Sequence, residues 1–386
     1  MAARVLSRAA GRVGVRLPMQ GSSGRRVAHR RAASRAAVPR GGASAAASSS
    51  PPHVSVMLEE VLGAFHGREL RTFVDCTLGA GGHSSAVAAA HAELATLVGL
   101  DVDPTAHAIA APRIRAAAGN GDLRVELQLS NFARLAEACE AAGVGARSGA
   151  DGVLLDLGVS SMQLDDRSRG FSFLAPDERA DMRMDPSSAL DAAALVNTWS
   201  EEDIGRVLRE YGEERRWRRM AASVVRARER QPVETVGDLI RALGLPLERR
   251  RGVDKIHPAT RAFQAIRIAV NGELDVLRSV LPQAVHALAP GGRLAVISFH
   301  SLEDRMVKRC FREAAAQARA PSKAEVAAGL AFERERDEKW AALLGEDLPP
   351  MRLVNRKARA PSKGESEDNR RARSAKLRVI ERAELT

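Results

Sequence analysis

The feature that most limits the fold of this chain is an alternation of short apolar runs with longer helical stretches between residues 73 and 158. The apolar runs are four to eight residues long, as strands are, and the segments between them have helical character. The predicted strands are Phe73–Leu78, Leu94–Leu100, Leu123–Leu129 and Gly152–Leu157, and the predicted helices are His83–Ala90, Thr105–Ala118 and Phe132–Ala142. This alternation predicts an α/β fold, with a parallel sheet covered by helices on both faces.

The pattern changes in the middle of the chain and then returns. A further strand is predicted at Arg293–Phe299, after a long helix from about Pro258 to Leu288. Residues 165–255 show helical periodicity and no convincing strand, and their predicted helices are Asn197–Tyr211, Arg215–Arg230 and Thr235–Leu243. We therefore expect a sheet domain formed by residues 51–164 and 256–386, interrupted by a helical insertion over residues 165–255.

Several classes of protein are excluded by what the sequence lacks. The three cysteines, Cys76, Cys139 and Cys310, are far apart and form no CxxC pair. This excludes a disulfide framework, predicts no metal site and is typical of a reducing compartment. No apolar stretch approaches 18 residues, so we predict no transmembrane segment. The HExxH, GxSxG and GxxxxGK[ST] patterns are also absent, which removes support for a metalloprotease, an esterase or a P-loop enzyme.

The positive charge of the chain is concentrated at its start. The net charge of the 386 residues is +11, but residues 1–50 hold ten arginines, no lysine and no acidic residue. The remainder has 49 basic and 48 acidic residues and is nearly neutral. Any RNA-binding surface on the body must therefore be a local patch. Two such patches are residues 205–251, with thirteen arginines and seven acids, and residues 351–386, with eleven basic and five acidic residues. Solvated helix faces are the alternative explanation for the first of them.

Residues 1–50 resemble a targeting segment. They are rich in Ala, Arg and Ser, lack acids and lack the apolar core of a secretory signal. We predict an organellar transit peptide; a disordered basic tail that contacts nucleic acid is the alternative. The four-residue recurrence of Arg4, Arg8, Arg12 and Arg16 favours a mitochondrial address, whereas the length and the Ser-rich end favour a plastid. Between these two organelles, the plastid is preferred.

Two segments at predicted strand ends have the character of a ligand site. The run Asp75–His83 contains Gly79, Gly81 and Gly82 and joins the first strand to the first helix, where main-chain N–H groups can approach a ligand. It is not a GxGxxG fingerprint, and alone it could be a plain tight turn. Asp101, at the end of the second strand, strengthens the prediction of a ligand site, because an acidic side chain there can accept hydrogen bonds from ribose hydroxyls.

Three further polar segments complete the candidate site. Asp156 ends the fourth predicted strand, although in isolation it could be a helix N-cap. The run His257–Gln264 precedes the long helix, and the run Ser298–Arg305 follows the last strand. The carboxyl ends of parallel strands share one edge of a sheet, so Asp101, Asp156 and the run after residue 298 are expected at the same edge.

Taken together, these runs resemble the bacterial MraW/RsmH family. The resemblance covers about residues 53–312 and 371–382 and rests on motifs that follow one another in the family's order. They are His53–Glu60, Gly79–Ser84, Leu155–Asp166, Arg169–Phe173, Asp181–Asp185, Tyr211–Arg215, His257–Val270 and Ile297–Lys308. Cys76, where a small residue is common, and Arg371, where proline is usual, depart from the family pattern.

The resemblance implies a fold, an activity and a substrate. Members are S-adenosylmethionine-dependent methyltransferases of a Rossmann-like, class I fold that modify N4 of a cytidine in small-subunit ribosomal RNA. By motif, Gly81, Gly82 and His83 would cradle the methionine part of the cofactor, and Asp101 would bind its ribose. Phe132 would flank the adenine, and Asp156 and Gln163 would complete the cofactor-binding set.

The catalytic residues are less constrained than the cofactor residues. An exocyclic amine is a poor nucleophile, so the enzyme must align it and accept hydrogen bonds from it. We predict Asp156 as that acceptor. His257, Arg261 and His300 are candidates for holding the base or a phosphate, and each could instead have a purely structural role.

Two other functions compete with this one. The same fold could methylate another substrate, or the chain could be a non-catalytic factor that binds RNA during ribosome assembly. Intact Gly81–His83, Asp101 and Asp156 favour the enzyme. The sequence leaves the oligomeric state open, monomer or homodimer, and predicts the small ribosomal subunit as the partner, with no membrane.

Overall fold

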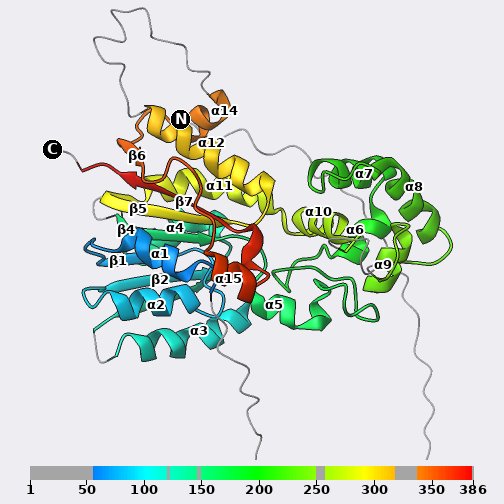
Figure 1. Cartoon of the computed structure of the whole chain (residues 1–386), viewed down its shortest axis with the longest axis horizontal. Helices are drawn as coiled ribbons and strands as arrows, with labels where there is room; N and C mark the ends of the chain where they lie inside the picture. Colours follow the sequence, from blue (N-terminus) through cyan, green and yellow to red (C-terminus); the bar gives the residue numbers. More distant parts are fainter. Residues whose placement is uncertain (1–54, 120–121, 146–148, 249–256, 318–336, 385–386) are drawn as a thin grey trace, which may run out of the picture. The chain divides into compact units, whose positions relative to one another are not determined.

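The structure is a computed structural model that describes residues 55–119, 122–145, 149–248, 257–317 and 337–384. The predicted transit peptide therefore lies outside the described residues. A seven-stranded sheet has the order β3-β2-β1-β4-β5-β7-β6 (Figure 1). Within the described part of the chain, every helix is too short or too polar to span a bilayer.

Five strands of the sheet are parallel neighbours. They are β1 (Thr72–Asp75), β2 (Thr96–Asp101), β3 (Arg124–Leu129), β4 (Ala150–Asp156) and β5 (Leu288–Ser298). Each matches a predicted strand with shifted ends. Because β1 pairs with β2 on one side and β4 on the other, the strand order reverses at β1, and ligands of such sheets bind at that point.

The helices cover the two faces of this sheet. The first face holds α4 (Leu135–Ala141), α11 (Glu273–His286), α12 (Ser301–Gln317) and α14 (Glu338–Leu344), and the second holds α1 (Leu58–Phe65), α2 (Gly82–Ala90) and α3 (Pro104–Ala117). Successive strand residues alternate between these faces: Val153 and Leu155 join the first cluster, and Leu154 joins the second. This is the side-chain alternation of a strand that is buried on both sides. The predicted Rossmann-like fold class is confirmed.

The C-terminal tail completes the sheet, which the sequence did not predict. β7 (Lys376–Arg382) pairs antiparallel with β5, and β6 (Met351–Leu353) pairs antiparallel with β7. The short helix α15 (Lys363–Asp368) and the turn η3 (Ala372–Ser374) lie between these two strands. The charged residues of β7 masked its apolar face, where Leu377 and Val379 are buried. The tail is thus part of the sheet, not only a basic surface.

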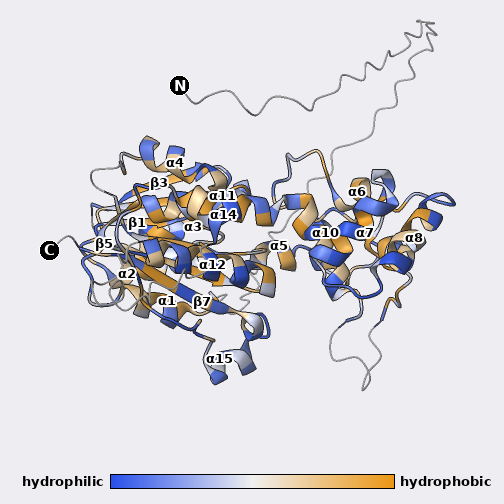
Figure 2. Ribbon diagram, turned by 90° about the horizontal axis from the view of Figure 1, so that it is seen from above, coloured by the Kyte–Doolittle hydropathy of each residue, from blue (hydrophilic) through white to orange (hydrophobic). Residues whose placement is uncertain are grey.

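A separate cluster of helices follows β4. It contains α6 (Ala192–Thr198), α7 (Glu201–Glu210), α8 (Trp217–Arg228) and α9 (Val236–Ala242), preceded by α5 (Ser161–Asp165) and the turn η2 (Arg167–Arg169). Helix α10 (Thr260–Asn271) packs in the same cluster through Phe263 and Ile266. In Figure 2, α7 and α8 carry hydrophobic and hydrophilic residues on different parts of each turn, as helices with one buried face do. The helical cluster therefore extends beyond residue 255.

Two predicted helices are each broken in two. Residues 258–288 form α10 and α11, because Gly272 adopts a left-handed conformation with φ 60° that ends one helix and starts the next. Residues 197–211 are divided by Ser200, whose hydroxyl caps α7 by accepting from the N–H of Asp203. The apolar periodicity continued across both breaks, which is why the sequence predicted single helices.

Candidate functional site

A cavity of about 810 Å³ lies at the carboxyl ends of β1, β2 and β4. Its volume is within the range of small-molecule sites. The predicted residues that line it are Gly82, His83, Asp101, Phe132, Asp156 and Gln163. Gly81 does not line it but shapes the turn beside it. The structure thus brings the predicted cofactor residues to one place.

Helix α2 begins at the wall of this cavity. Gly81 precedes it with φ 72°, a left-handed conformation that favours glycine, and a Cβ atom on Gly81 would lie 2.9 Å from the Cβ of Ala110. The first N–H groups of a helix have no acceptor within the helix. The turn therefore presents main-chain donors to the cavity, beside the Arg113 side chain on the same wall.

Asp101 ends β2 with both carboxylate oxygens held by main-chain donors. Its Oδ2 accepts from the N–H of Gly79 at 2.8 Å, and its Oδ1 accepts from the N–H of Asp103 at 2.9 Å. Burial raises the pKa of Asp101, and these two hydrogen bonds oppose that effect. Each oxygen retains further acceptor capacity. Asp101 is thus a fixed acceptor that suits a pair of ribose hydroxyls.

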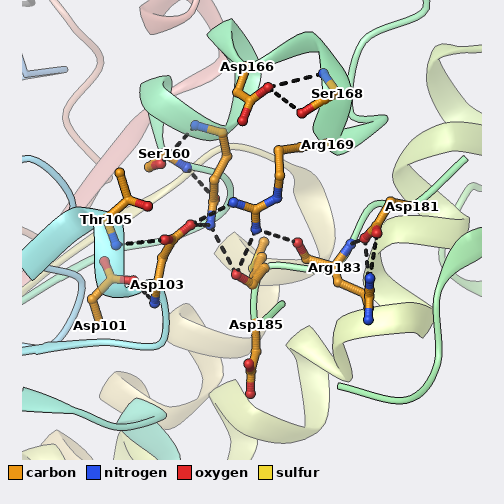
Figure 3. A network of polar contacts seen from close by, with 12 residues as sticks. Asp101, Asp103, Thr105, Ser160, Asp166, Ser168, Arg169, Asp181, Arg183 and Asp185 are labelled. Carbon is orange, nitrogen blue, oxygen red and sulfur yellow. Dashed lines mark hydrogen bonds and ion pairs between the residues drawn. The ribbon is translucent and has the colours of Figure 1, made fainter. Parts of the chain in front are cut away.

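A charged network that includes Arg169 of the helical insertion, residues 165–255, supports the main chain at Asp101 (Figure 3). Arg169 donates through Nη1 to Asp103 Oδ2 at 2.8 Å and through Nη2 to the carbonyls of residues 183 and 184, at 2.8 and 3.0 Å. Burial alone would raise the pKa of Asp103, but the hydrogen bond from Arg169 and other donors lower it overall. Arg169 and Asp103 were not predicted as site residues; the only sequence signal was the Arg169–Phe173 motif.

Gln163 has a mainly architectural role in the structure. It forms a reciprocal capping box with Ser160 at the start of α5, and its Nε2 lies 3.5 Å from Asp103 Oδ2 and 3.4 Å from the carbonyl of Met184. Its amide is thus used within the protein, while its side chain borders the cavity. Phe132 borders the cavity near Asp101, at the start of the turn η1 (Phe132–Arg134), which Asn131 caps.

Asp156 ends β4 and differs from Asp101 in its surroundings. Its Oδ1 is buried with no hydrogen-bond partner among the described residues, and its Oδ2 lies 3.7 Å from His83 Nδ1. Burial raises the pKa of Asp156 well above the usual range, and the carboxylates of Asp75 and Glu303 raise it further. A strongly perturbed carboxyl group in a cleft is a typical functional group.

His83 is neutral beside this carboxyl group. Burial lowers the pKa of His83 to about 4. Its Nε2 lies 3.1 Å from the carbonyl of Val56, which can only accept, so Nε2 carries the hydrogen. Nδ1 therefore presents a lone pair to Asp156, and the contact is not an ion pair at neutral pH. At 3.7 Å the two groups are neighbours without a hydrogen bond between them.

A second buried carboxylate, Asp75, supports the main chain at Asp156. Asp75 accepts from Ser84 Oγ at 2.6 Å and from the N–H of Thr77 at 3.1 Å, and Thr77 Oγ1 accepts from the N–H of Asp156 at 2.7 Å. Burial raises the pKa of Asp75 to about 6, although the hydrogen bonds from Ser84 and Thr77 oppose this. Asp75 thus fixes the two strand ends that carry the site, a role that the sequence did not predict.

The other end of the cavity is formed by residues from α10, α11 and the turn before α12. Arg267 pairs with both oxygens of Glu273, with Nε and Nη2 each 2.8 Å away. Glu303 accepts from the N–H of Phe299 at 2.8 Å. Together with His300, these two glutamates bring three potential metal ligands within 4.8 Å of one another, but the Arg267 guanidinium already balances the charge of Glu273. The sequence placed the run Ser298–Arg305 at this edge, and its Phe299 and Glu303 line the cavity. It missed Arg267 and Glu273, which the break at Gly272 brings together.

The structure does not bring His257, Arg261 or His300 to the cavity wall. Both ring nitrogens of His257 are used, by the carbonyl of Leu247 and the N–H of Ala259, and its ring stacks on Phe173 with centroids 4.2 Å apart. It therefore organises the turn before α10. Arg261 is exposed and points to the carbonyl of Glu213. The prediction that these residues hold the base or a phosphate is unsupported.

His300 lies behind Glu303. Its Nδ1 lies 3.4 Å from the N–H of Glu303, and its Nε2 lies 3.0 Å from Glu303 Oε1 without forming a well-oriented hydrogen bond. Burial would raise the pKa of Glu303, but His300 and Arg267 lower it overall. His300 therefore acts on the cavity through Glu303 and does not face the cavity itself.

The tail contributes a residue that sequence reasoning left open. Arg371 lines the cavity and pairs with Asp165 of α5 at 2.7 Å, across 206 positions of sequence. Glu365 of α15 accepts from the N–H of Met57 at 2.6 Å. The tail therefore borders the mouth of the cavity. Other basic residues of the tail are used internally: Arg378 and Lys376 pair with Asp304.

The arginine patch of the helical region is exposed. Arg215, Arg216, Arg218 and Arg219 all face solvent near the start of α8. Arg216 is 3.7 Å from Glu214, and the Arg218 guanidinium lies 4.2 Å from the ring centroid of Trp217. Arg215 and Arg219 have no ion pair with any described residue. An exposed cluster of basic groups beside an aromatic ring is typical of a nucleic-acid contact.

Comparison with known proteins identifies the family. The description "MraW methylase family" belongs to a family model that matches residues 50–383. The chain belongs to this family. A ribosomal RNA small subunit methyltransferase H of Symbiobacterium thermophilum is 43% identical over 330 residues, which cover 85% of this chain and 96% of that protein. The protein of the same name from Citrifermentans bemidjiense is 42% identical over 330 residues, 86% and 98% of the two chains.

The predicted family and the prediction of a methyltransferase are thus confirmed. Among solved structures, an rRNA methylase from Streptococcus thermophilus aligns at 11% identity with a TM-score of 0.31, over 85% of this chain and 93% of that one. That similarity is too weak to add to the argument. The cavity fits a methyl donor with a ribose and a carboxylate, because the acceptor Asp101 and the donors at α2 line the same wall.

Proposed function

We propose that this protein is an organellar enzyme that methylates N4 of a cytidine in small-subunit ribosomal RNA, with S-adenosylmethionine as the methyl donor. The observation that carries the proposal is a cavity lined by two unlike aspartates, at the ends of the strands β2 and β4 that flank β1. Each oxygen of Asp101 accepts from one main-chain N–H and can accept again, whereas Asp156 has an oxygen with no partner among the described residues. Membership of the MraW methylase family supports the reaction, and the names of the relatives support the substrate.

The residues near β2 would hold the donor. Asp101 would accept from the two ribose hydroxyls, and Phe132 would contact the adenine. The N–H groups at the start of α2, next to Gly82, together with Arg113, would bind the methionine carboxylate. When bound, the donor supplies an electrophilic methyl group on a positively charged sulfur. The Asp103–Arg169 pair keeps the acceptor side of this site rigid.

Asp156 would act on the nucleophile. The lone pair of the cytosine amine is delocalised into the ring, and an acceptor for the amine hydrogens makes it more available. As the N–C bond forms, the amine must lose a proton, and the Asp156 carboxyl group, which lines the cavity and is 25% exposed, would take it. The raised pKa of Asp156 gives this carboxyl group the proton affinity that a general base needs. The base must leave its stack to reach this position.

The helical region and the tail would bind RNA. Residues 165–255 carry the exposed patch around Arg218, and the tail carries Arg371 at the cavity mouth. Residues 1–50 would act as a transit peptide, and their length and Ser-rich end favour the plastid over the mitochondrion.

The test is methylation of small ribosomal subunits that lack the modification. Purified protein and labelled S-adenosylmethionine should yield N4-methylcytidine, identified by mass spectrometry of the digested ribosomal RNA. Organelles depleted of the protein should lose that nucleoside from their small-subunit RNA. Methylation of a protein or small molecule with unmodified RNA would reject the proposed substrate, and tight RNA binding without any transfer would reject the enzyme.

A further inference from the structure

The cavity has an aromatic ring at each of its two ends. Phe132 lies near Asp101, and Phe299 lies near Asp156, at the start of the turn before α12. Among the described residues that line the cavity, these are the two phenylalanines, and none is a tyrosine or a tryptophan. One cavity with two separate rings suits two flat ligands, and a cavity of about 810 Å³ is within the range that can hold a cofactor with a base beside it.

Arg267 borders the same end as Phe299. A Cβ atom placed on Gly158, two residues after Asp156, would be 3.9 Å from Arg267 Nη2 and 3.9 Å from Phe299 Cδ2. The guanidinium and the ring therefore flank one point next to Asp156. Gly158 itself lines the cavity and places no side chain there.

The Arg267 guanidinium is only partly used by the protein. Glu273 takes Nε and one hydrogen of Nη2, and Nη1 has no hydrogen-bond partner among the described residues. The side chain is 17% exposed, and it lines the cavity. A buried ion pair adds little to stability compared with apolar side chains. A buried arginine that is fixed on one side and has free donors on the other is better explained by recognition of an acceptor.

We infer that the Arg267 end of the cavity reads the target base: Phe299 stacks on it, and Arg267 donates a hydrogen bond to the O2 carbonyl of cytosine. The inference rests on the proposed function. Cytosine presents an amine, a ring nitrogen acceptor and a carbonyl acceptor along one edge. Asp156 accepts from the amine, and Arg267 donates to the far acceptor. Uracil lacks the amine, and adenine has a C–H where the carbonyl of cytosine lies, so neither satisfies both groups.

The test combines a change in the base with a change in the protein. Single-turnover methylation is measured at saturating cofactor on small subunits that carry cytidine or 2-thiocytidine at the target position, since sulfur is a poor acceptor. For the wild type, the sulfur should slow transfer about tenfold, the effect of one charge-assisted hydrogen bond. Arg267→Lys keeps the charge opposite Glu273 but loses the planar fork. It should slow transfer to cytidine about 10- to 100-fold and show little further loss with 2-thiocytidine.

Arg293→Lys is the matched control. Arg293 is also partly buried, at 14% exposed, and its Nε donates to the buried Glu381 at 2.8 Å, but it does not line the cavity. It should keep both the wild-type rate and the wild-type sulfur effect. If Arg267→Lys fails to fold, the double variant Arg267→Met/Glu273→Met removes both partners of the ion pair and should lose the sulfur effect in the same way.

The outcomes separate the inference from the proposed function. An equal sulfur effect in the wild type and in the Arg267 variants would overturn the base-reading role. No transfer by the wild type to unmodified cytidine would instead overturn the proposed function. Cofactor affinity, measured by calorimetry, should be unchanged in every variant, and a loss confined to cofactor affinity would also reject the assignment.

Discussion

Asp101 and Asp156 end β2 and β4, the strands that flank β1, and both line one cavity, but their hydrogen bonds differ. Both oxygens of Asp101 accept from main-chain N–H groups, whereas Asp156 has an oxygen without a partner and a neutral histidine lone pair beside it. A carboxylate fixed by the backbone is suited to steady binding. A buried one left unsatisfied is held at a high free energy and is available for chemistry. The contrast separates a binding end from a reaction end.

The largest effect is expected at the reaction end. Asp156→Asn keeps the shape of the side chain but loses its proton affinity, and its amide can present a donor to the amine. It should lower the single-turnover methylation rate about 100- to 1000-fold, the range for loss of one transition-state partner. Calorimetric cofactor affinity should change much less than the rate. A variant whose whole defect is weak cofactor binding would erase the contrast.

The complementary effect is expected at the binding end. Asp101→Ala removes an acceptor for two hydroxyls, and charge-assisted hydrogen bonds contribute about 1.5–3 kcal/mol. Cofactor affinity should therefore fall about 10- to 100-fold by calorimetry. At saturating cofactor, the transfer rate should stay near that of the wild type. If the rate remained low at saturation, Asp101 would belong to the reaction end as well.

A smaller effect is expected far from both aspartates. Charge reversal of Arg215, Arg216, Arg218 and Arg219 should weaken RNA binding about tenfold and flatten its salt dependence, because each phosphate contact releases counterions. Cofactor affinity should not change. The control is charge reversal of Arg115 and Lys339, two exposed residues on helices that cover the sheet. It should have little effect on RNA affinity. Equal RNA affinity in the patch variant and the wild type would show that RNA docks elsewhere.

The smallest effect is expected from removal of the leader. Residues 1–50 carry ten of the arginines and precede His53–Glu60, the first of the motifs that resemble the family. A chain that begins at Pro51 should fold and keep full cofactor affinity and activity, as measured by calorimetry and single-turnover transfer. Loss of either property would place the leader in the catalytic unit and remove its proposed role as a transit peptide.

The sequence predicted the sheet side of the site and missed the rest for a physical reason. Asp101 and Asp156 follow apolar strands, and strand ends of a parallel sheet meet at one edge, so local pattern was sufficient. Arg371 reaches Asp165 across 206 positions, which no local pattern encodes. His257 showed the opposite failure, since its polar motif predicted a ligand contact and the structure uses both ring nitrogens for the turn before α10.

The most direct test of the reaction end is the pH dependence of single-turnover transfer at saturating cofactor. Only ionised Asp156 can accept the amine proton, and burial raises the pKa of Asp156. The transfer rate should therefore rise with pH, and the midpoint of this rising limb should lie well above the pKa of an ordinary carboxyl group. Asp101→Ala should keep this limb, and the residual activity of Asp156→Asn should lack it. A limb near pH 6 that persists in Asp156→Asn would belong to Asp75 and would contradict the assignment of Asp156 as the proton acceptor.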